Sequence, residues 1–182
     1  MKKNLTVEET FDLAVKSYQK KKFHTAEKLY KEVLKKHPDH ANTYVNLGMV
    51  LKKLEKHKEA IDCYEKAIKI NPNDPNPHYN LGNLYKNFDK YEEAINFYNK
   101  AIQINPNHLS AYNNLGNVFK DLGEYKKAIN CYTKAIQINP NNADIYSNLG
   151  LSYKKIGKQT LSVDNFQKAL AKRTNIRLEV DN

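Results

Sequence analysis

The chain has 182 residues, of which 27% are charged, and 30 Lys and Arg against 20 Asp and Glu give it a net charge of +10. No apolar run approaches the roughly 18 residues that a membrane span requires, and no apolar amino-terminal stretch is present to act as a secretory signal. These features argue against a membrane or secreted protein, so we expect a cytoplasmic protein with no membrane partner.

From residue 7 onward the sequence repeats itself every 34 residues. We expect five repeats, at residues 7–40, 41–74, 75–108, 109–142 and 143–176, with a lead-in of residues 1–6 and a tail of residues 177–182. We number the positions within each repeat from 1 to 34. The repeats abut without a linker, which predicts one elongated domain. A fixed period of this length is typical of stacked supersecondary units.

Each repeat is expected to contain two helices, ten in all, and no strand. In the second repeat, Leu47 and Leu51 share one face of a first helix, and Tyr64 and Ile68 share one face of a second. The small Gly48 lies where the two helices should cross closely. One helix pair cannot bury its apolar face alone, so we expect the pairs to stack.

The expected helix ends carry suitable residues. Thr6, three residues before Glu9, predicts a capping box that opens the first helix. Pro72 cannot continue the helix before it, so it marks the end of the second repeat. Asp74 is the expected N-cap of the next helix, with Pro75 at its first position.

Small, aromatic and proline residues recur in register. The recurring residues are Leu47-Gly48, Leu81-Gly82, Leu115-Gly116 and Leu149-Gly150 at positions 7 and 8, Tyr64, Tyr98, Tyr132 and Phe166 at position 24, and Pro72, Pro106, Pro140 and Thr174 at position 32. The first repeat is weaker, with Ala14 at the glycine position. This pattern resembles the tetratricopeptide repeat family over residues 7–176. The resemblance implies an all-α fold, a right-handed α-solenoid of five helix-turn-helix repeats whose first helices line a concave groove.

The excess positive charge is not distributed like a nucleic-acid-binding surface. The net charges of the five repeats, in chain order, are +2, +1, 0, +2 and +4, so the excess lies toward the ends. Nearly all the cations are lysines, and the only arginines are Arg173 and Arg177. Nucleic-acid surfaces favour arginine for bidentate and stacking contacts. We therefore expect no nucleic-acid partner, and the abundant Lys, Asn, Tyr and Ile indicate an AT-rich genome.

No set of residues predicts catalysis, a metal site or a cofactor, so the chain is not expected to be an enzyme. The histidines share no repeat position that would stack them; they are His24, His37, His40, His57, His78 and His108. Cys63 and Cys131 stand at position 23 two repeats apart, too far for a disulfide, and are interpreted as apolar fillers of a reduced protein. The carboxylates are expected on solvent-facing positions.

A row of asparagines is the first candidate binding feature. Position 6 carries Asn46, Asn80, Asn114 and Asn148, and position 9 adds Asn83 and Asn117 one turn along the same helix face. An asparagine amide both donates and accepts, so such a row could hold the backbone of an extended peptide about every third residue. The alternative is that these side chains are solvated or bond to a neighbouring helix.

A row of lysines is the second candidate binding feature. Position 12 carries Lys52, Lys86, Lys120 and Lys154, which could favour an acidic partner. The alternative is a solubilising helix end, because a cation is favoured near the negative pole of the helix dipole.

Family resemblances refine the expected ligand. The Asn-Leu-Gly row resembles that of the protein O-linked N-acetylglucosamine transferases, in which such asparagines hold the substrate chain. Members that bind the carboxyl terminus of a chaperone use basic residues at positions 2, 5 and 6, and this sequence has none there. Recognition of a chaperone carboxylate is therefore not expected.

The last repeat differs from the others in a consistent direction. Gln159, Asn165 and Lys172 replace apolar residues where a further repeat would pack, which is typical of a terminal capping repeat. The residues after 176 are too few for an added capping helix. The remaining apolar residues should stay partly exposed and allow self-association through this repeat; they are Val163, Phe166 and Leu170.

The sequence predicts a non-catalytic scaffold for protein–protein interaction that binds a protein or peptide segment in its groove. The alternative is the substrate-targeting arm of a larger glycosyltransferase or sulfotransferase-type enzyme, acting within one chain or in trans. The string from Ala26 to Tyr30 resembles repeats that begin such bacterial enzymes.

Overall fold

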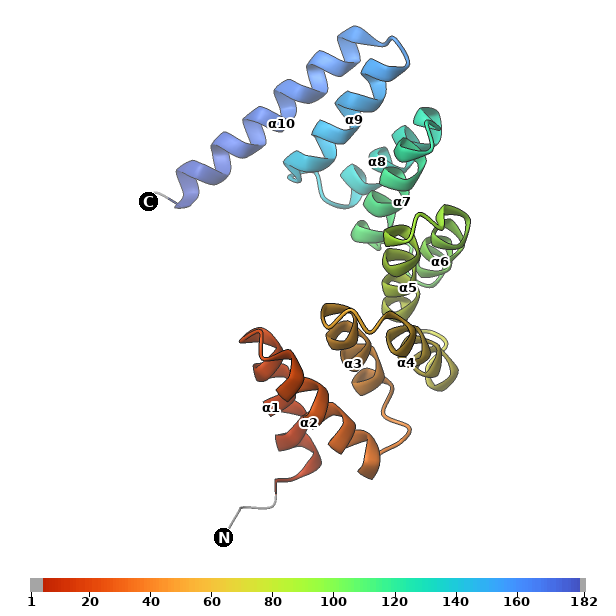
Figure 1. Ribbon diagram of the computed structural model, residues 1–182. Coiled ribbons are helices and arrows are strands. Elements are labelled where there is room, and N and C mark those ends of the chain that lie inside the picture. Colours follow the sequence, from red (N-terminus) through yellow and green to blue (C-terminus); the bar gives the residue numbers. More distant parts are fainter. Residues whose placement is uncertain (1–4, 181–182) are drawn as a thin grey trace. The chain divides into compact units, whose positions relative to one another are not determined.

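The computed structural model describes residues 5–180, with side chains through Thr174 (Figure 1). This described part consists of ten helices and contains no strand, which confirms the all-α prediction. The contacts group the helices into two units, residues 1–88 and 89–182, and each is described by itself. Unit 1 contains α1 (Val7–Gln19), α2 (Phe23–Lys36), α3 (Ala41–Lys53), α4 (His57–Ile70) and α5 (Pro75–Asn87). Unit 2 contains α6 (Tyr91–Ile104), α7 (Leu109–Asp121), α8 (Tyr125–Ile138), α9 (Ala143–Lys155) and α10 (Gln159–Val180).

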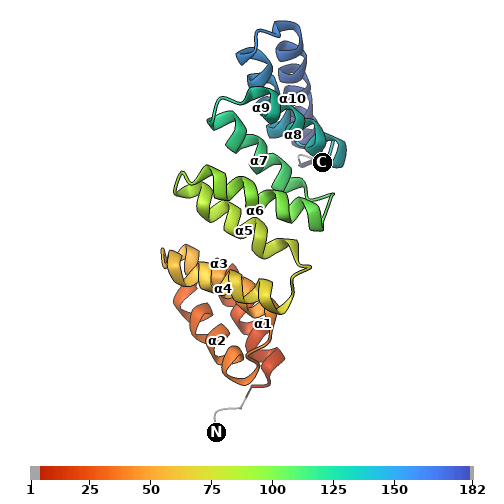
Figure 2. The same ribbon diagram turned by 90° about the vertical axis from the view of Figure 1, so that its right-hand side faces the viewer.

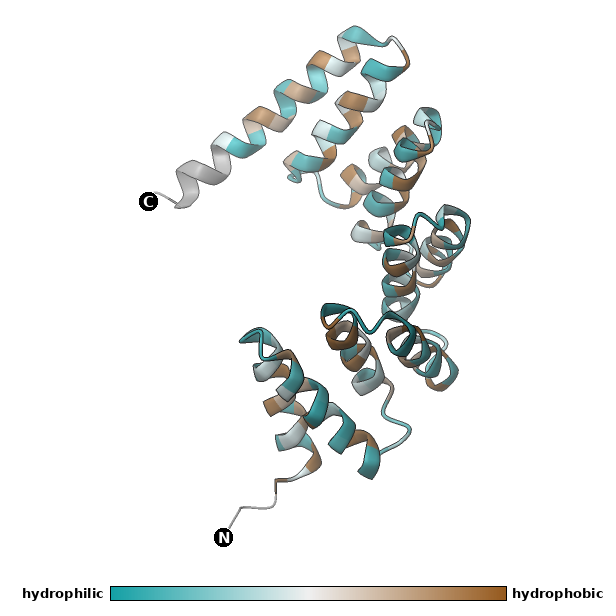
Figure 3. Cartoon of the chain, viewed as in Figure 1, coloured by the Kyte–Doolittle hydropathy of each residue, from teal (hydrophilic) through white to brown (hydrophobic). Residues whose placement is uncertain are grey.

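Helix pairs are the building blocks of both units. Unit 1 pairs α1 with α2 and α3 with α4, and unit 2 pairs α7 with α8 and α9 with α10 (Figures 1 and 2). Each pair also packs on its neighbour in the same unit, through α2 and α3 in unit 1 and through α8 and α9 in unit 2. The helices carry both apolar and polar residues (Figure 3), and the apolar ones supply the core. The single domain expected from the sequence stays a prediction.

A tyrosine ring lying on a glycine holds each of two pairs together. Tyr64 and Tyr132 stand at position 24 of their repeats, on the second helices, and are completely buried. A Cβ atom added to Gly48 would lie 2.6 Å from Cε1 of Tyr64, and one added to Gly116 would lie 2.6 Å from Cε1 of Tyr132. Only a residue without a side chain allows this approach, which explains the glycine at position 8.

The turn inside each repeat is built on one left-handed residue at position 15. Gly123 and Gly157 have φ of 76°, whereas Lys21, Glu55 and Asp89 occupy the same place with φ of 58°, 60° and 56°. In the second repeat the backbone N–H of Lys56 donates to the carbonyl of Leu51 at 2.9 Å, which closes a Schellman turn. Glycine adopts this backbone at no steric cost, but the other residues are strained there.

Residues at position 34 cap the helix that follows. The predicted capping box at Thr6 and Glu9 is present, and the side chain of Asp74 accepts the backbone N–H of Asn76 at 2.9 Å. His40 does the same work for α3, because its Nδ1 accepts the backbone N–H of Thr43 at 3.3 Å. The histidines that end repeats are thus helix caps, a role that the sequence pattern alone did not indicate.

One carboxylate departs from the expected solvent-facing placement. Glu27 is only 7% exposed, and its Oε1 lies 2.7 Å from Nζ of Lys31 and 2.9 Å from Nζ of Lys56. Burial alone would raise the pKa of Glu27, but the hydrogen bonds and charges of the two lysines lower it overall. Because Lys56 is the N-cap residue of α4, this ion pair fixes α2 against the start of α4.

The last helix is longer than its counterparts. Helix α10 has 22 residues, against 14 in α8, and it continues to Val180, into the segment predicted to be a short tail from residue 177. In the earlier repeats a proline follows shortly after the second helix, whereas Thr174 occupies that position here. Without the proline, nothing removes a backbone donor or obstructs the next turn.

A comparison of two glycine-to-alanine variants tests the packing of rings on glycines. We expect Gly116→Ala to lower the free energy of unfolding by about 1–3 kcal/mol through overpacking against the buried ring of Tyr132. Gly150→Ala should be nearly neutral, because its Cβ would lie 3.0 Å from a Phe166 ring that is 36% exposed and can move. Urea unfolding followed by circular dichroism measures both. Equal effects would contradict the proposed role of the buried ring.

A second pair of variants tests the strained turns. Glu55→Gly should raise the free energy of unfolding by about 1 kcal/mol, because the left-handed backbone no longer strains a side chain. Gly123→Ala should lower it by a similar amount, although an added Cβ there meets nothing within 4 Å. The same urea titration applies, and a destabilised Glu55→Gly protein would show that its side chain matters more than its backbone.

Candidate functional site

The first helices of unit 1 form the inner wall of a groove. Helix α3 contacts both α1 and α5 directly, and a hollow of about 420 Å³ lies over these three helices. Residues at positions 2, 5, 6 and 9 line most of it. The lining residues are Phe11, Asn42, Val45, Asn46, Met49, Asp74, Asn76, Tyr79 and Asn80. The floor is therefore a mixture of apolar side chains and amides, and two of the predicted residues, Asn46 and Asn80, belong to it.

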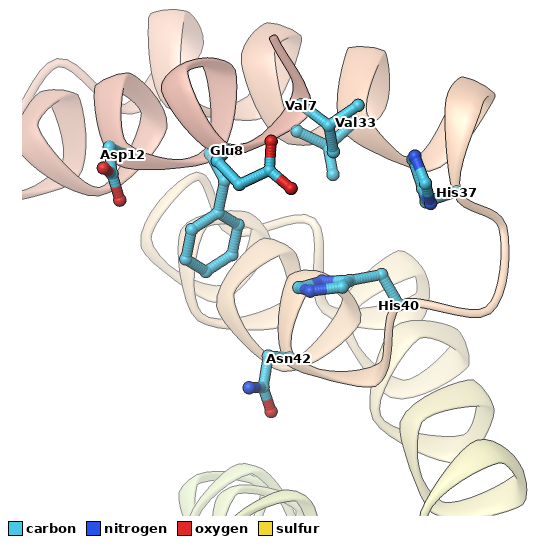
Figure 4. Close-up of a pocket in the computed structure, with 8 residues that line it drawn as sticks. Val7, Glu8, Asp12, Val33, His37, His40 and Asn42 are labelled. Carbon is cyan, nitrogen blue, oxygen red and sulfur yellow. The ribbon is translucent and has the colours of Figure 1, made fainter.

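A smaller hollow of about 260 Å³ adjoins the groove at α1, since Phe11 and Asn42 line both (Figure 4). Glu8 and Asp12 occupy positions 2 and 6, one helical turn apart, where α3 and α5 carry asparagines. Among the described residues neither carboxylate has a hydrogen bond or an ion pair. The ring of Phe11 is held edge-on by His40 at a centroid distance of 5.5 Å. This end of the groove is acidic and aromatic.

Several asparagines of the predicted row bond to other helices. Tyr30 on α2 has a side-chain hydrogen bond with Asn46 on α3. In unit 2 the hydroxyl of Tyr132 donates to Oδ1 of Asn117 at 2.8 Å, and Nδ2 of Asn148 donates to the same oxygen at 3.3 Å. These bonds connect α8, α7 and α9. For these side chains the structure matches the alternative in which asparagine bonds to a neighbouring helix.

The remaining asparagines of the row divide into two cases. Asn83 and Asn114 also have interaction partners. Asn80 has none among the described residues, and it is half-buried in the groove of unit 1. Asn42, at position 2, is likewise without a hydrogen bond in the part of the chain that the structure describes. These two amides are therefore the ones available to a ligand.

Comparisons with known proteins agree with the helix pairs and the repeat. Models described as TPR repeat or Tetratricopeptide repeat match residues 11–40, 29–62, 51–87, 75–108, 97–130 and 116–157. A crystal structure of MamA is 31% identical, with a TM-score of 0.81 over 90% of this chain and 96% of that one. The chain belongs to the tetratricopeptide repeat family. No curated protein matches it.

Two further solved structures share the tetratricopeptide fold at lower identity. MamA from Desulfovibrio magneticus RS-1, from residue 41 to its end, is 17% identical, with a TM-score of 0.81 over 93% of this chain and 96% of that one. YrrB, described as a TPR protein with an unusual peptide-binding site, is 20% identical, with a TM-score of 0.72 over 97% of this chain and 91% of that one. At these identities the likeness concerns the fold.

The lysines at position 12 lie at the ends of the first tetratricopeptide helices. Lys52 and Lys86 are half-buried on α3 and α5, and burial followed by repulsion from Lys53 and Lys86 lowers the pKa of Lys52. In unit 2, Nζ of Lys120 lies 3.8 Å from Oδ1 of Asp121, and Lys154 is exposed on α9. Lys52, Lys53 and Lys86 thus repel one another near the ends of α3 and α5, and none of them lines either hollow.

The two cysteines of the tetratricopeptide chain lie on the second helices, one in each unit. Cys63 and Cys131 are buried, reduced thiols, and burial raises the pKa of each to about 11. No group of three or more histidine, cysteine, aspartate or glutamate side chains within residues 5–174 could hold a metal ion. No described helix combines the length and apolar character needed to cross a bilayer.

Groove residues that the sequence pattern did not single out are mainly apolar or acidic. Phe11, Val45 and Tyr79 stand at position 5, which entered the sequence argument only through its lack of a basic clamp. Glu8 and Asp12 stand at positions 2 and 6, where the next two repeats carry asparagines. This change of residue type was the sequence signal that could have identified them as groove residues. A repeat pattern emphasises what is common to the copies, whereas these residues differ from copy to copy.

Two asparagine variants distinguish an amide that stabilises the fold from an amide that is available to a ligand. Asn117→Ala should lower the free energy of unfolding by about 1–2 kcal/mol, because it leaves the buried hydroxyl of Tyr132 without a partner. Asn80→Ala should be nearly neutral. Thermal unfolding measures both, and in a Tyr132→Phe background the effect of Asn117→Ala should largely disappear. An equal loss in that background would contradict the role assigned to the bond.

Proposed function

We propose that the groove of unit 1 binds an extended segment of a partner protein and that the chain works as a non-catalytic interaction scaffold. The observation that carries this proposal is the hollow over α1, α3 and α5, in which the unpartnered amides of Asn42 and Asn80 stand beside the apolar side chains of Val45, Met49 and Tyr79. YrrB, a TPR protein of the same fold with an unusual peptide-binding site, supports the same kind of ligand.

The amides provide recognition that does not depend on the ligand's sequence. Each asparagine side chain has two N–H donors and a carbonyl acceptor, so it can pair with both groups of a peptide bond. Asn42 and Asn80 lie on adjacent first helices, so a segment that crosses these helices meets both. The apolar floor between them would receive a side chain of the segment. Backbone pairing and an apolar contact together favour an extended, unfolded partner segment.

Charge gives the groove a direction. Glu8 and Asp12 lie in the first half of α1, and Asp74 is the N-cap of α5. Lys52 and Lys86 lie in the last turns of α3 and α5. A segment lying across the helices would therefore have an acidic flank on one side and a basic flank on the other. We propose a ligand with a basic side chain directed into the smaller hollow and acidic groups facing the lysines.

Selection from a random peptide library displayed on phage tests this function. We expect binders enriched in Lys or Arg, and an affinity loss of about tenfold in the Asn42→Ala/Asn80→Ala protein, as expected for one or two lost hydrogen bonds. Replacing Glu8 by Gln and Asp12 by Asn should remove the preference for basic residues. Isothermal titration calorimetry with a selected peptide gives the affinities.

The matched control is Asn73→Ala, which removes an exposed amide from a turn of the same unit, outside the groove. It should bind the selected peptide like the unaltered protein. Unchanged affinity in the Asn42→Ala/Asn80→Ala protein, with its helicity intact, would exclude the groove as the binding site.

A further inference from the structure

Helix α10 carries an apolar row that nothing in the described structure covers. The exposed fractions are 42% for Leu161, 54% for Val163, 36% for Phe166 and 63% for Leu170. In the preceding repeat of the same unit, the equivalents of the last three are Ile129, Tyr132 and Ile136, and they pack in one cluster with Ile145 and Leu149 of α9. Tyr132 is completely buried there. The row on α10 is thus the surface that a second helix normally presents to the next first helix.

Helix α1 presents the complementary half of the same contact. The leucine at position 7 is 43% exposed as Leu13, but only 4%, 4% and 5% exposed as Leu47, Leu115 and Leu149. Leu47 belongs to α3, which has α2 packed against it, and Leu149 belongs to α9, which has α8 packed against it. Leu13 is exposed because no second helix stands before α1 in the described chain.

The charges on the two helices are complementary. Glu8 and Glu9 occupy the first turn of α1. Helix α10 carries Lys168, Lys172 and Arg173. Lys168 is paired with Asp164 and Arg173 with Asp144, whereas Lys172 bonds only to the neutral side chain of Asn141, at 2.8 Å, so its charge is not neutralised. A short turn joins each second helix to the first helix of the next repeat, as between Ile138 and Ala143. The start of that first helix therefore lies near the end of the second helix. The same arrangement would bring the acidic first turn of α1 near Lys172.

Pairing of α10 with another α10 would cover only one of the two exposed apolar faces. A two-fold contact of this kind brings identical surfaces together and leaves Leu13 of α1 uncovered. A contact of α10 with α1 instead covers both faces and brings the acidic first turn of α1 toward Lys172.

We propose that a second copy of this chain docks its α1 on the exposed face of α10 and so repeats, between copies, the contact made between adjacent repeats. Such a contact uses two different surfaces, so it need not close on itself and chains of copies can grow. The contact is weaker than the internal one, because Glu9 and Lys16 stand on α1 where α3 has the buried Thr43 and Val50.

Sedimentation velocity of the full chain tests the proposal between about 1 µM and about 1 mM, the range expected for a weak contact. The average mass should rise with concentration. Leu13→Gln and, separately, Val163→Gln/Leu170→Gln should each remain monomeric in that range. An equimolar mixture of these two variants should form a species of two copies, because each retains one intact face. Circular dichroism and the thermal midpoint establish that both variants remain folded.

The control is Leu151→Gln, which alters an equally exposed leucine on α9 outside the proposed face and should associate like the unaltered chain. Several results would overturn the proposal. They are a chain that stays monomeric throughout the range, a Leu13→Gln variant that still associates fully through α10 alone, a variant mixture that stays monomeric, or a loss of association in the control.

Discussion

The packing of a ring at position 24 against a small residue at position 8 is the contact on which the helix pairs depend. The rings of Tyr64 and Tyr132 fill the space that Gly48 and Gly116 leave open. The same residue type points its hydroxyl toward the groove helices, where Tyr30 bonds Asn46 and Tyr132 bonds Asn117. Tyr132 therefore both packs inside its helix pair and restrains the amide of Asn117 on the first helix.

The hydrogen bonds of these tyrosines differ from repeat to repeat. The hydroxyl of Tyr64 is buried without a hydrogen-bond partner among the described residues, and Asn80 is also unpaired. A buried hydroxyl left unpaired costs about 1–3 kcal/mol, so this repeat is less completely satisfied than the one containing Tyr132. The difference lies at position 9, where the repeat of Tyr64 has Met49 and the repeat of Tyr132 has Asn117. In unit 2 the oxygen of Asn117 accepts bonds from both Tyr132 and Asn148.

The ends of the repeats follow the same physical rule as their interior. A helix pair buries its apolar face only by packing on a neighbour, so a first and a last pair each retain an unfinished surface. Here α1 replaces two of the buried contact positions with Glu9 and Lys16, while α10 keeps Val163 and Leu170 exposed. The contact proposed between copies therefore buries less apolar surface than the contact between adjacent repeats, which makes it the weaker of the two.

The sequence by itself determined the period, the ten helices and most of their boundaries, because packing positions, prolines and caps recur in every copy and depend on local spacing. It also identified Asn80 as a candidate, but only the tertiary structure separated it from Asn117, because hydrogen bonds between helices depend on side-chain placement across about 15 to 30 residues. The burial of Glu27 and the acidic hollow at Glu8 and Asp12 were decided in the same way. A repeat pattern records what all copies need for stacking, whereas the shape and charge of a groove come from residues in which the copies differ.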